Sequence, residues 1–177
     1  YTRGLFEWLW KAPWSNPAFS ALILSILTFG LLGGITGVLA GTEQLNIRVH
    51  NTISITGHFH GTVAAGTTLA FMGITYYVLP LIFRREVVAK TLAVYQPWFF
   101  GIGISMVSLG MMAAGLYGIP RRHADVTGFG GAPFAFDFDP TGFLFISIMG
   151  IGALLAAIGG ALYCLIAVGT LLKGKKL

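Results

Sequence analysis

Long apolar runs separated by short polar links dominate the hydrophobic pattern of this chain. About 20 consecutive apolar residues in a helix cross the ~30 Å hydrocarbon core of a bilayer. Four runs reach that length and predict transmembrane helices at about 17–40, 52–83, 92–118 and 141–172. The predicted fold class is therefore an all-α integral membrane protein, with residues 17–177 forming the transmembrane domain.

Residues 1–16 differ from these runs because they mix aromatic and charged side chains. Trp8, Trp10 and Trp14 lie among Glu7 and Lys11, a mixture typical of the boundary between lipid headgroups and hydrocarbon. We expect 1–16 to be an interfacial amphipathic segment that lies on the membrane surface.

Small residues in the first run predict close helix packing. Gly30 with Gly34, and Gly33 with Gly37, form two offset pairs spaced four residues apart. Such pairs let another helix approach closely in a membrane. They predict packing and carry no chemistry.

Composition supports a membrane protein: 55% of the residues are hydrophobic and only 10% are charged. The net charge of +5 does not indicate nucleic acid, because the basic residues cluster in the links between apolar runs. The single cysteine, Cys164, falls inside a span and is expected to be a small core residue, which excludes a disulfide framework or a thiolate metal cluster.

The basic residues also predict an orientation. Four spans place both ends of the chain on one side of the membrane, and the link between the second and third spans lies on that side too. This side carries most of the basic residues: Arg3, Lys11, Arg84, Arg85, Lys90, Lys173, Lys175 and Lys176. The opposite side carries Arg48, Arg121 and Arg122. The positive-inside rule therefore makes both termini cytoplasmic.

The adjacent Arg121 and Arg122 indicate a binding site for an anion, since guanidinium groups bind carboxylates bidentately. The alternative is an arginine pair solvated at the lipid headgroups.

Two histidines lie near the start of the second run, in Gly57-His58-Phe59-His60-Gly61. Ionisable groups inside a span are costly and mark functional sites. Positions i and i+2 of a helix point about 200° apart, so His58 and His60 do not share one metal as residues at i and i+4 do. Because haem iron takes an axial imidazole, a helix between two haems would offer each a ligand, with Phe59 on the short path between them. The alternative is two core histidines bonded to carbonyls of neighbouring helices.

These residues and others at fixed spacings resemble subunit I of the haem-copper oxygen reductases, the terminal respiratory oxidases. The matching stretches are Val49-His50-Asn51-Thr52, Gly57-His58-Phe59-His60, Pro97 and Gly118-Ile119-Pro120-Arg121-Arg122. His-Phe-His followed by Pro-Arg-Arg is a specific combination, although neither piece suffices alone. The resemblance covers essentially the whole chain and implies the last four helices of a twelve-helix bundle, of a divergent, B-type-like kind.

The resemblance implies roles for individual side chains. His58 resembles the axial ligand of the high-spin haem at the oxygen-reducing site, and His60 resembles an axial ligand of the low-spin haem. Arg121 and Arg122 resemble the pair that holds the haem propionates. His50 resembles a residue near those propionates and the water above them.

Two departures from the family pattern lie beside His50. Many members carry Asp where this chain has Asn51, and that Asp helps to bind magnesium, so the expectation of a magnesium ion is weakened. Asn46 replaces an acid that takes part in proton loading in other members. Asn51 and Phe59 are still expected beside the cofactors.

The implied activity is the reduction of oxygen to water, coupled to proton translocation, in a prokaryotic-type cytoplasmic membrane with His58 and His60 nearer its outer side. The family's copper centre needs three histidines from earlier helices, and only His50 and His123 remain here. Copper is therefore expected in the remainder of subunit I, on a separate polypeptide or on another part of the same chain. Further expected partners are a subunit II-like electron-entry subunit, other membrane subunits, and cytochrome c or quinol as electron donor. The alternatives are a nitric oxide reductase of the same superfamily and a haem-free structural or transport subunit.

Overall fold

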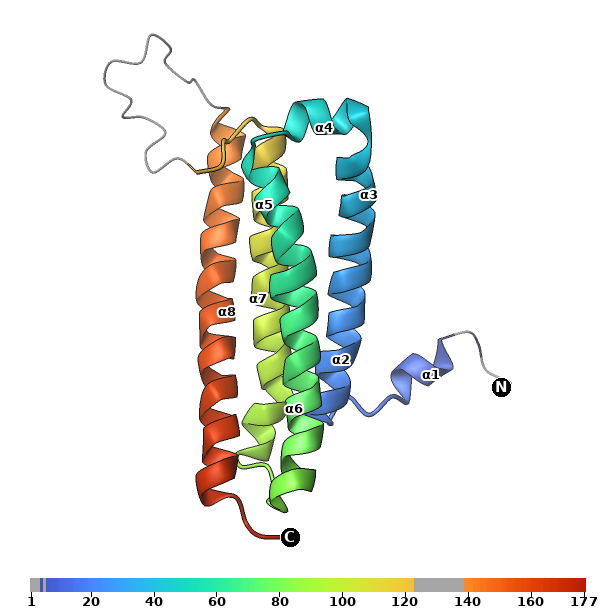
Figure 1. Cartoon of the computed structure of the whole chain (residues 1–177), viewed down its shortest axis with the longest axis vertical. Coiled ribbons are helices and arrows are strands. Elements are labelled where there is room, and N and C mark those ends of the chain that lie inside the picture. The colour runs from blue at the N-terminus through green and yellow to red at the C-terminus, as the bar shows by residue number, and fades with distance from the viewer. Residues whose placement is uncertain (1–3, 5, 123–138) are drawn as a thin grey trace.

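The computed structural model describes residues 4, 6–122 and 139–177. Arg3 and His123, which enter the charge and ligand predictions, lie outside these residues. Four long helices run side by side (Figure 1), and each is long and apolar enough to cross a membrane: Pro17–Gly41, Ile53–Phe83, Lys90–Leu116 and Pro140–Lys173. We number them spans 1 to 4. The predicted all-α membrane fold with four spans is confirmed.

Spans 1 and 2 change helix type midway. Span 1 consists of α2 (Pro17–Leu27), the π-helix η1 (Thr28–Ile35) and α3 (Thr36–Gly41). Span 2 consists of α5 (Ile53–Phe59), the π-helix η2 (His60–Thr67) and α6 (Thr68–Phe83). The two π-helices lie against each other, and π-turns inside helices are frequent at functional sites. The sequence did not predict these π-helices, because the hydrophobic pattern of a continuous apolar run is the same whether the helix is α or π.

The link between spans 1 and 2 is also helical. The short helix α4 (Glu43–Val49) crosses one end of the bundle between α3 and α5 (Figure 1). The sequence indicated only a polar link here, since a helix of 7 residues is too short to set out a clear period. We call this end of the bundle the α4 end and the opposite end, where span 1 begins and the C-terminus lies, the terminal end.

The core is built around span 3, the most buried of the four spans. It is the single helix α7 (Lys90–Leu116), and α8 (Pro140–Lys173) packs along it (Figure 1). The fully buried Gln96 of α7 joins three spans: its Oε1 accepts from the Tyr76 hydroxyl at 2.9 Å, and its Nε2 donates to the Gly159 carbonyl at 3.0 Å. This amide holds spans 2 and 4 to span 3.

The two glycine pairs of span 1 have different surroundings. Gly33 lies against Thr62 and Gly37 lies against His58, so the close helix packing predicted for this pair is confirmed, and the helix it meets is span 2. A Cβ on Gly30 would meet nothing within 4 Å in the described part of the chain. The expectation for Cys164 was wrong, because its side chain lies on the exposed side of α8.

The segment before span 1 contains one short helix, α1 (Glu7–Trp10), which leads away from the bundle near the terminal end (Figure 1). Trp14 Nε1 donates to the Leu9 carbonyl at 2.8 Å. The Trp14 ring lies 5.7 Å from the Trp98 ring, measured between centroids, and so ties this segment to α7. Its interfacial role remains a prediction.

The start of α8 shows how a span end is capped. Asp139 Oδ1 accepts from the Thr141 N–H at 2.8 Å and satisfies a free backbone donor at the N-terminus of α8. Hydrogen bonds from Thr141 hold the pKa of the Asp139 carboxyl below its usual range. The charged cap therefore persists at neutral pH and is lost only when the pH falls through that lowered pKa.

Candidate functional site

His58 and His60 lie at the junction of α5 and η2, close to the α4 end. The rotation of this helix is fixed by Gly57, which is buried against α7. Ser108 Oγ donates to the Gly57 carbonyl at 2.8 Å, and a Cβ on Gly57 would lie 2.7 Å from the backbone nitrogen of Met112. Since the Gly57 face is held against α7, the directions of the next three side chains are determined.

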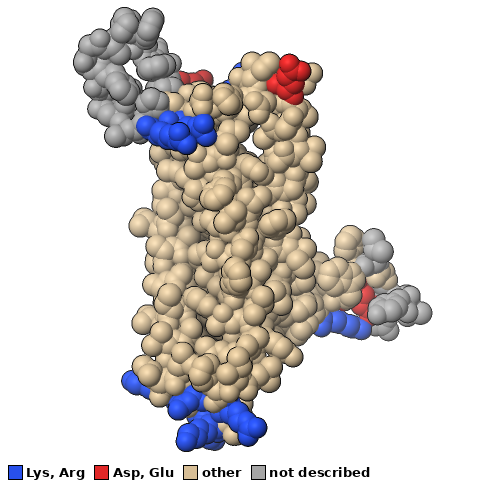
Figure 2. All heavy atoms as spheres, viewed as in Figure 1, with Lys and Arg blue, Asp and Glu red and all other residues tan. Residues whose placement is uncertain are grey.

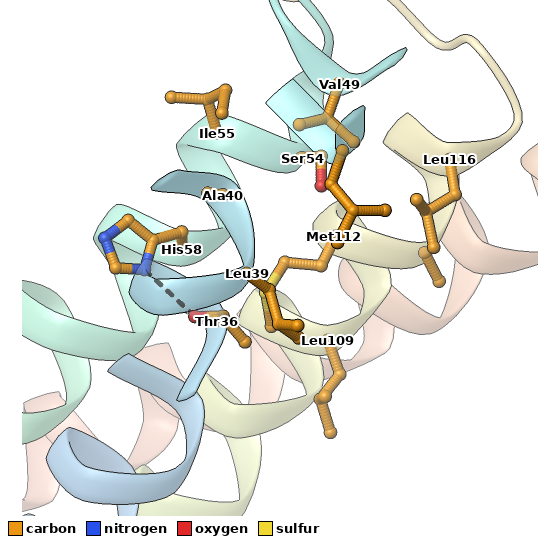
Figure 3. A pocket seen from close by; sticks show the side chains of 12 residues that line it. Thr36, Leu39, Ala40, Val49, Ser54, Ile55, His58, Leu109, Met112 and Leu116 are labelled. Atoms are coloured by element: carbon orange, nitrogen blue, oxygen red, sulfur yellow. Dashed lines mark hydrogen bonds between the residues drawn. The ribbon is translucent and has the colours of Figure 1, made fainter. Parts of the chain in front are cut away.

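The His58 imidazole lies against span 1. Its Nδ1 is 2.9 Å from Thr36 Oγ1 (Figure 3). The Thr36 hydroxyl also contacts the Leu32 and Gly33 carbonyls. Carbonyls only accept, so the hydroxyl donates to them and its oxygen accepts from a proton on Nδ1. This tautomer leaves the lone pair on Nε2, and in Figure 3 that nitrogen lies on the far side of the ring from Thr36.

The His60 imidazole has the same tautomer for a different reason. Its Nδ1 is 2.8 Å from the Thr56 carbonyl of the preceding turn, and only a protonated nitrogen can donate to a carbonyl. Among the described residues, no hydrogen bond engages Nε2 of either His58 or His60. If both histidines were only core residues that donate hydrogen bonds, the bond made by each Nδ1 would be explained. Neither Nε2 would then have a role.

Phe59 separates the two imidazoles along the helix. Its side chain is 55% exposed, and its ring centroid lies 6.2 Å from that of His60 in an edge-to-face arrangement. A large aromatic ring exposed beside two available imidazoles forms an apolar surface on this side of span 2. That surface suits contact with a flat apolar group or with another helix.

His58 also borders a cavity of about 370 Å³ between α3, α4, α5 and α7 (Figure 3). The walls are mainly apolar and include Leu39, Val49, Met112 and Leu116. A low local dielectric strengthens hydrogen bonds. The bond between His58 and Thr36 therefore lies in surroundings that favour it.

At the α4 end, the start of span 2 is bonded to the segment that follows span 3. The Asn51 carbonyl accepts from the Arg121 N–H at 3.1 Å, and Asn51 Oδ1 accepts from Arg121 Nη2 at 2.8 Å. The Ile53 N–H donates to the Ile119 carbonyl at 2.9 Å. The structure thus brings together Asn51 and Arg121, which the sequence separates by 70 positions. His50 and Arg122 are exposed at the same end.

No group of three or more His, Cys, Asp or Glu side chains comes together in 6–122 and 139–177 as a metal site. Each histidine of span 2 therefore offers one ligand, and the remaining ligands of any metal must come from elsewhere. A haem meets this requirement, because its porphyrin supplies four nitrogens and leaves an axial position for one imidazole. The donor set fits two haems and does not form a protein-only metal cage.

Sequence reasoning did not identify Thr36, Thr56 or Ser108, which position the two histidines. Thr56 lies four residues before His60, and this spacing could have indicated a bond within one helix. Thr36 and Ser108 belong to other spans, so no local motif points to them.

Fold and site together define an integral membrane protein with two single imidazoles on one span, close to the end of the bundle that carries Arg121 and Arg122. The family model described as "Cytochrome C and Quinol oxidase polypeptide I" matches residues 2–162. The chain therefore belongs to the family of oxidase subunit I, and the resemblance drawn from the sequence is confirmed.

Individual relatives agree with this family. Over 122 residues the chain is 38% identical to cytochrome c oxidase subunit 1 of Thermus thermophilus, a match that covers 68% of this chain and 22% of that protein. Over 160 residues it is 32% identical to a probable quinol oxidase subunit 1 of Staphylococcus aureus, covering 88% and 22%. The chain thus spans about a fifth of the length of these relatives. Because one is named for cytochrome c and the other for quinol, the similarity selects neither electron donor.

A solved structure gives the same result for the fold. The cryo-EM structure of a heme-copper terminal oxidase dimer matches with a TM-score of 0.82 and 31% sequence identity. The match covers 99% of this chain and 31% of that one. Family and fold together place this chain in the subunit I family of the haem-copper oxidases.

Proposed function

We propose that this chain is the C-terminal portion of the catalytic subunit of a respiratory terminal oxidase, which reduces oxygen to water coupled to proton translocation. The observation that carries the proposal is the pair of imidazoles on span 2. Each has its Nδ1 bonded within the protein and its Nε2 available as a ligand. A ligating histidine usually donates its other ring N–H to a protein acceptor in this way.

His58 would hold the high-spin haem and His60 the low-spin haem. When bound, the haems supply the one-electron chemistry that protein side chains lack. The protein's part is to fix two axial ligands on one helix, whose rotation is set by Gly57 against α7. Phe59 would exclude water from the shortest path between the two ligands.

Arg121 and Arg122 would bind the haem propionates. A guanidinium has five N–H donors, and the Asn51 side chain uses one of those on Arg121. Since Asn51 is a neutral amide, Arg121 keeps its net charge for an anion. The same amide is a weaker magnesium ligand than a carboxylate, so we propose no magnesium ion here. His50 would lie near the propionates.

The chain would act only as part of a complex. Copper would be bound by the remainder of subunit I, and electrons from cytochrome c or quinol would enter through a subunit II-like partner. We propose that the terminal end is cytoplasmic in a prokaryotic-type membrane, because its surface gathers most of the basic side chains (Figure 2). His58 and His60 would then lie nearer the outer side, and residues 1–16 would lie at the inner interface.

A spectrum of the purified complex tests this function. We expect a reduced-minus-oxidised difference spectrum with one low-spin and one high-spin haem, and metal analysis with copper beside two haem irons. Non-haem iron in place of copper would indicate a nitric oxide reductase instead. A complex without haem would leave only the structural or transport alternative.

Replacement of Arg121 by Leu tests the propionate role. Hydrogen bonds to charged groups contribute about 1.5–3 kcal/mol each, and loss of a positive charge beside a propionate favours the oxidised haem. We expect the midpoint potential of at least one haem to fall by tens of millivolts, on the order set by ~59 mV per tenfold change in a one-electron equilibrium. Potentiometric titration followed by absorbance measures the shift.

Arg48→Leu is the matched control, because Arg48 is an exposed arginine of α4 at the same end. This variant should titrate like the parent. If Arg121→Leu and Arg48→Leu both overlay the parent, the arginine pair is solvated at the headgroups.

A further inference from the structure

We propose that Thr36 is a positioning residue for His58. Its hydroxyl oxygen accepts the Nδ1 proton, fixes the orientation of the ring and makes Nε2 a stronger electron donor toward haem iron. The inference rests on the proposed role of His58 as an axial ligand. It adds a residue of span 1 to the surroundings of a ligand on span 2.

The hydrogen bonds around the hydroxyl give this contact its direction. Thr36 Oγ1 lies beside the Leu32 carbonyl oxygen and 3.3 Å from that of Gly33, and it lies 2.9 Å from His58 Nδ1. Because the hydroxyl proton is given to a carbonyl, the oxygen lone pairs face the imidazole. Hydrogen bonds in such a chain polarise one another, so a hydroxyl that donates is also the better acceptor.

The packing around Thr36 makes the contact specific. Thr36 is the first residue of α3, directly after the π-helix η1. The neighbouring Gly37 leaves room for the ring: a Cβ there would lie 3.0 Å from His58 Cε1. Among the described residues that line the apolar cavity beside the two side chains, Ser54 is the one further residue with a polar side chain (Figure 3).

Thr28 shows that a threonine in this span need not have such a role. It opens η1 and its hydroxyl donates to the Leu24 carbonyl at 2.8 Å and the Ser25 carbonyl at 3.1 Å, the same pattern within the helix as Thr36. No histidine is hydrogen-bonded to it among the described residues. The two threonines share the bonds within the helix, and Thr36 alone of the two adds a bond to an imidazole.

The two histidines differ in how their Nδ1 protons are held. His60 donates to a backbone carbonyl of its own helix, which no side-chain replacement removes. His58 donates to a side chain of another span. Only the high-spin ligand should therefore respond to a change at one threonine.

Thr36→Val in the purified complex tests the proposal, because valine keeps the shape and removes the acceptor. With less electron donation from Nε2, we expect a lower iron–histidine stretching frequency in resonance Raman spectra of the reduced high-spin haem. Its midpoint potential should rise, because the oxidised iron loses the stronger donor. Thr36→Ser should restore both values toward the parent, and the low-spin haem should not change.

Thr28→Val is the matched control and should leave the stretching frequency and potential as in the parent. His58→Ala tests the ligand assignment of His58 separately from the positioning role of Thr36. If His58→Ala leaves the iron–histidine band intact, the ligand assignment itself is wrong. If His58→Ala removes the band but Thr36→Val leaves its frequency and the potential unchanged, the positioning role of Thr36 is overturned and the ligand assignment stands.

Discussion

Replacing His58 by Ala in the complex is expected to remove or disorder the high-spin haem and to reduce oxygen consumption to background. His60→Ala is expected to perturb chiefly the low-spin haem spectrum. The lesions should be separable because each imidazole offers one Nε2 to one iron, and its Nδ1 is bonded to a different partner. Absorbance spectra of the oxidised, reduced and carbon monoxide-bound complexes measure both effects.

Metal content and chemical rescue distinguish the loss of a ligand from misfolding. Copper should stay at its parental ratio in both variants, since no three-ligand metal site lies in the described part of this chain. His58→Gly with added imidazole should recover part of the high-spin spectrum. Identical spectra from His58→Ala and His60→Ala, or retention of both haems in both, would count against two separate haem ligands.

The four spans were predictable because membrane insertion imposes a long apolar run on each. The prediction for the third span, about 92–118, differs by two residues at each end from Lys90–Leu116. The candidate ligands His58 and His60 could also be found from the sequence, since both lie in one short stretch of a single helix. Their roles as haem ligands remain proposals.

Contacts between spans could not be predicted from the sequence. Thr36 and His58 meet only because spans 1 and 2 pack in one register, at a glycine that leaves space for the ring. Asn51 and Arg121 meet only because span 2 begins beside the end of span 3. A hydrophobic pattern fixes which residues are in the membrane, whereas these contacts depend on how the helices are turned and shifted against one another.

The second large effect is expected from Gly57→Ala. A Cβ at this position would lie 2.7 Å from the Met112 backbone nitrogen and 2.8 Å from the Ser108 carbonyl oxygen, so α5 must move away from α7. Overpacking of this kind costs about 1–3 kcal/mol, occasionally more. Because the same helix carries His58 and His60, we expect both haems to be lost together and the melting temperature of the complex to fall.

Gly30→Ala is the control for Gly57→Ala, since a Cβ at Gly30 would meet nothing within 4 Å in the described part of this chain. It should keep the parental haem content and melting temperature. Haem-to-protein ratios and thermal unfolding in detergent compare the two alanine variants directly. Parental values for Gly57→Ala would show that the contact with α7 does not set the direction of the ligands. Loss of a single haem from Gly57→Ala would show that His58 and His60 are positioned independently. Loss of both haems from this variant, together with separate effects of His58→Ala and His60→Ala, would establish that span 2 supports both ligands.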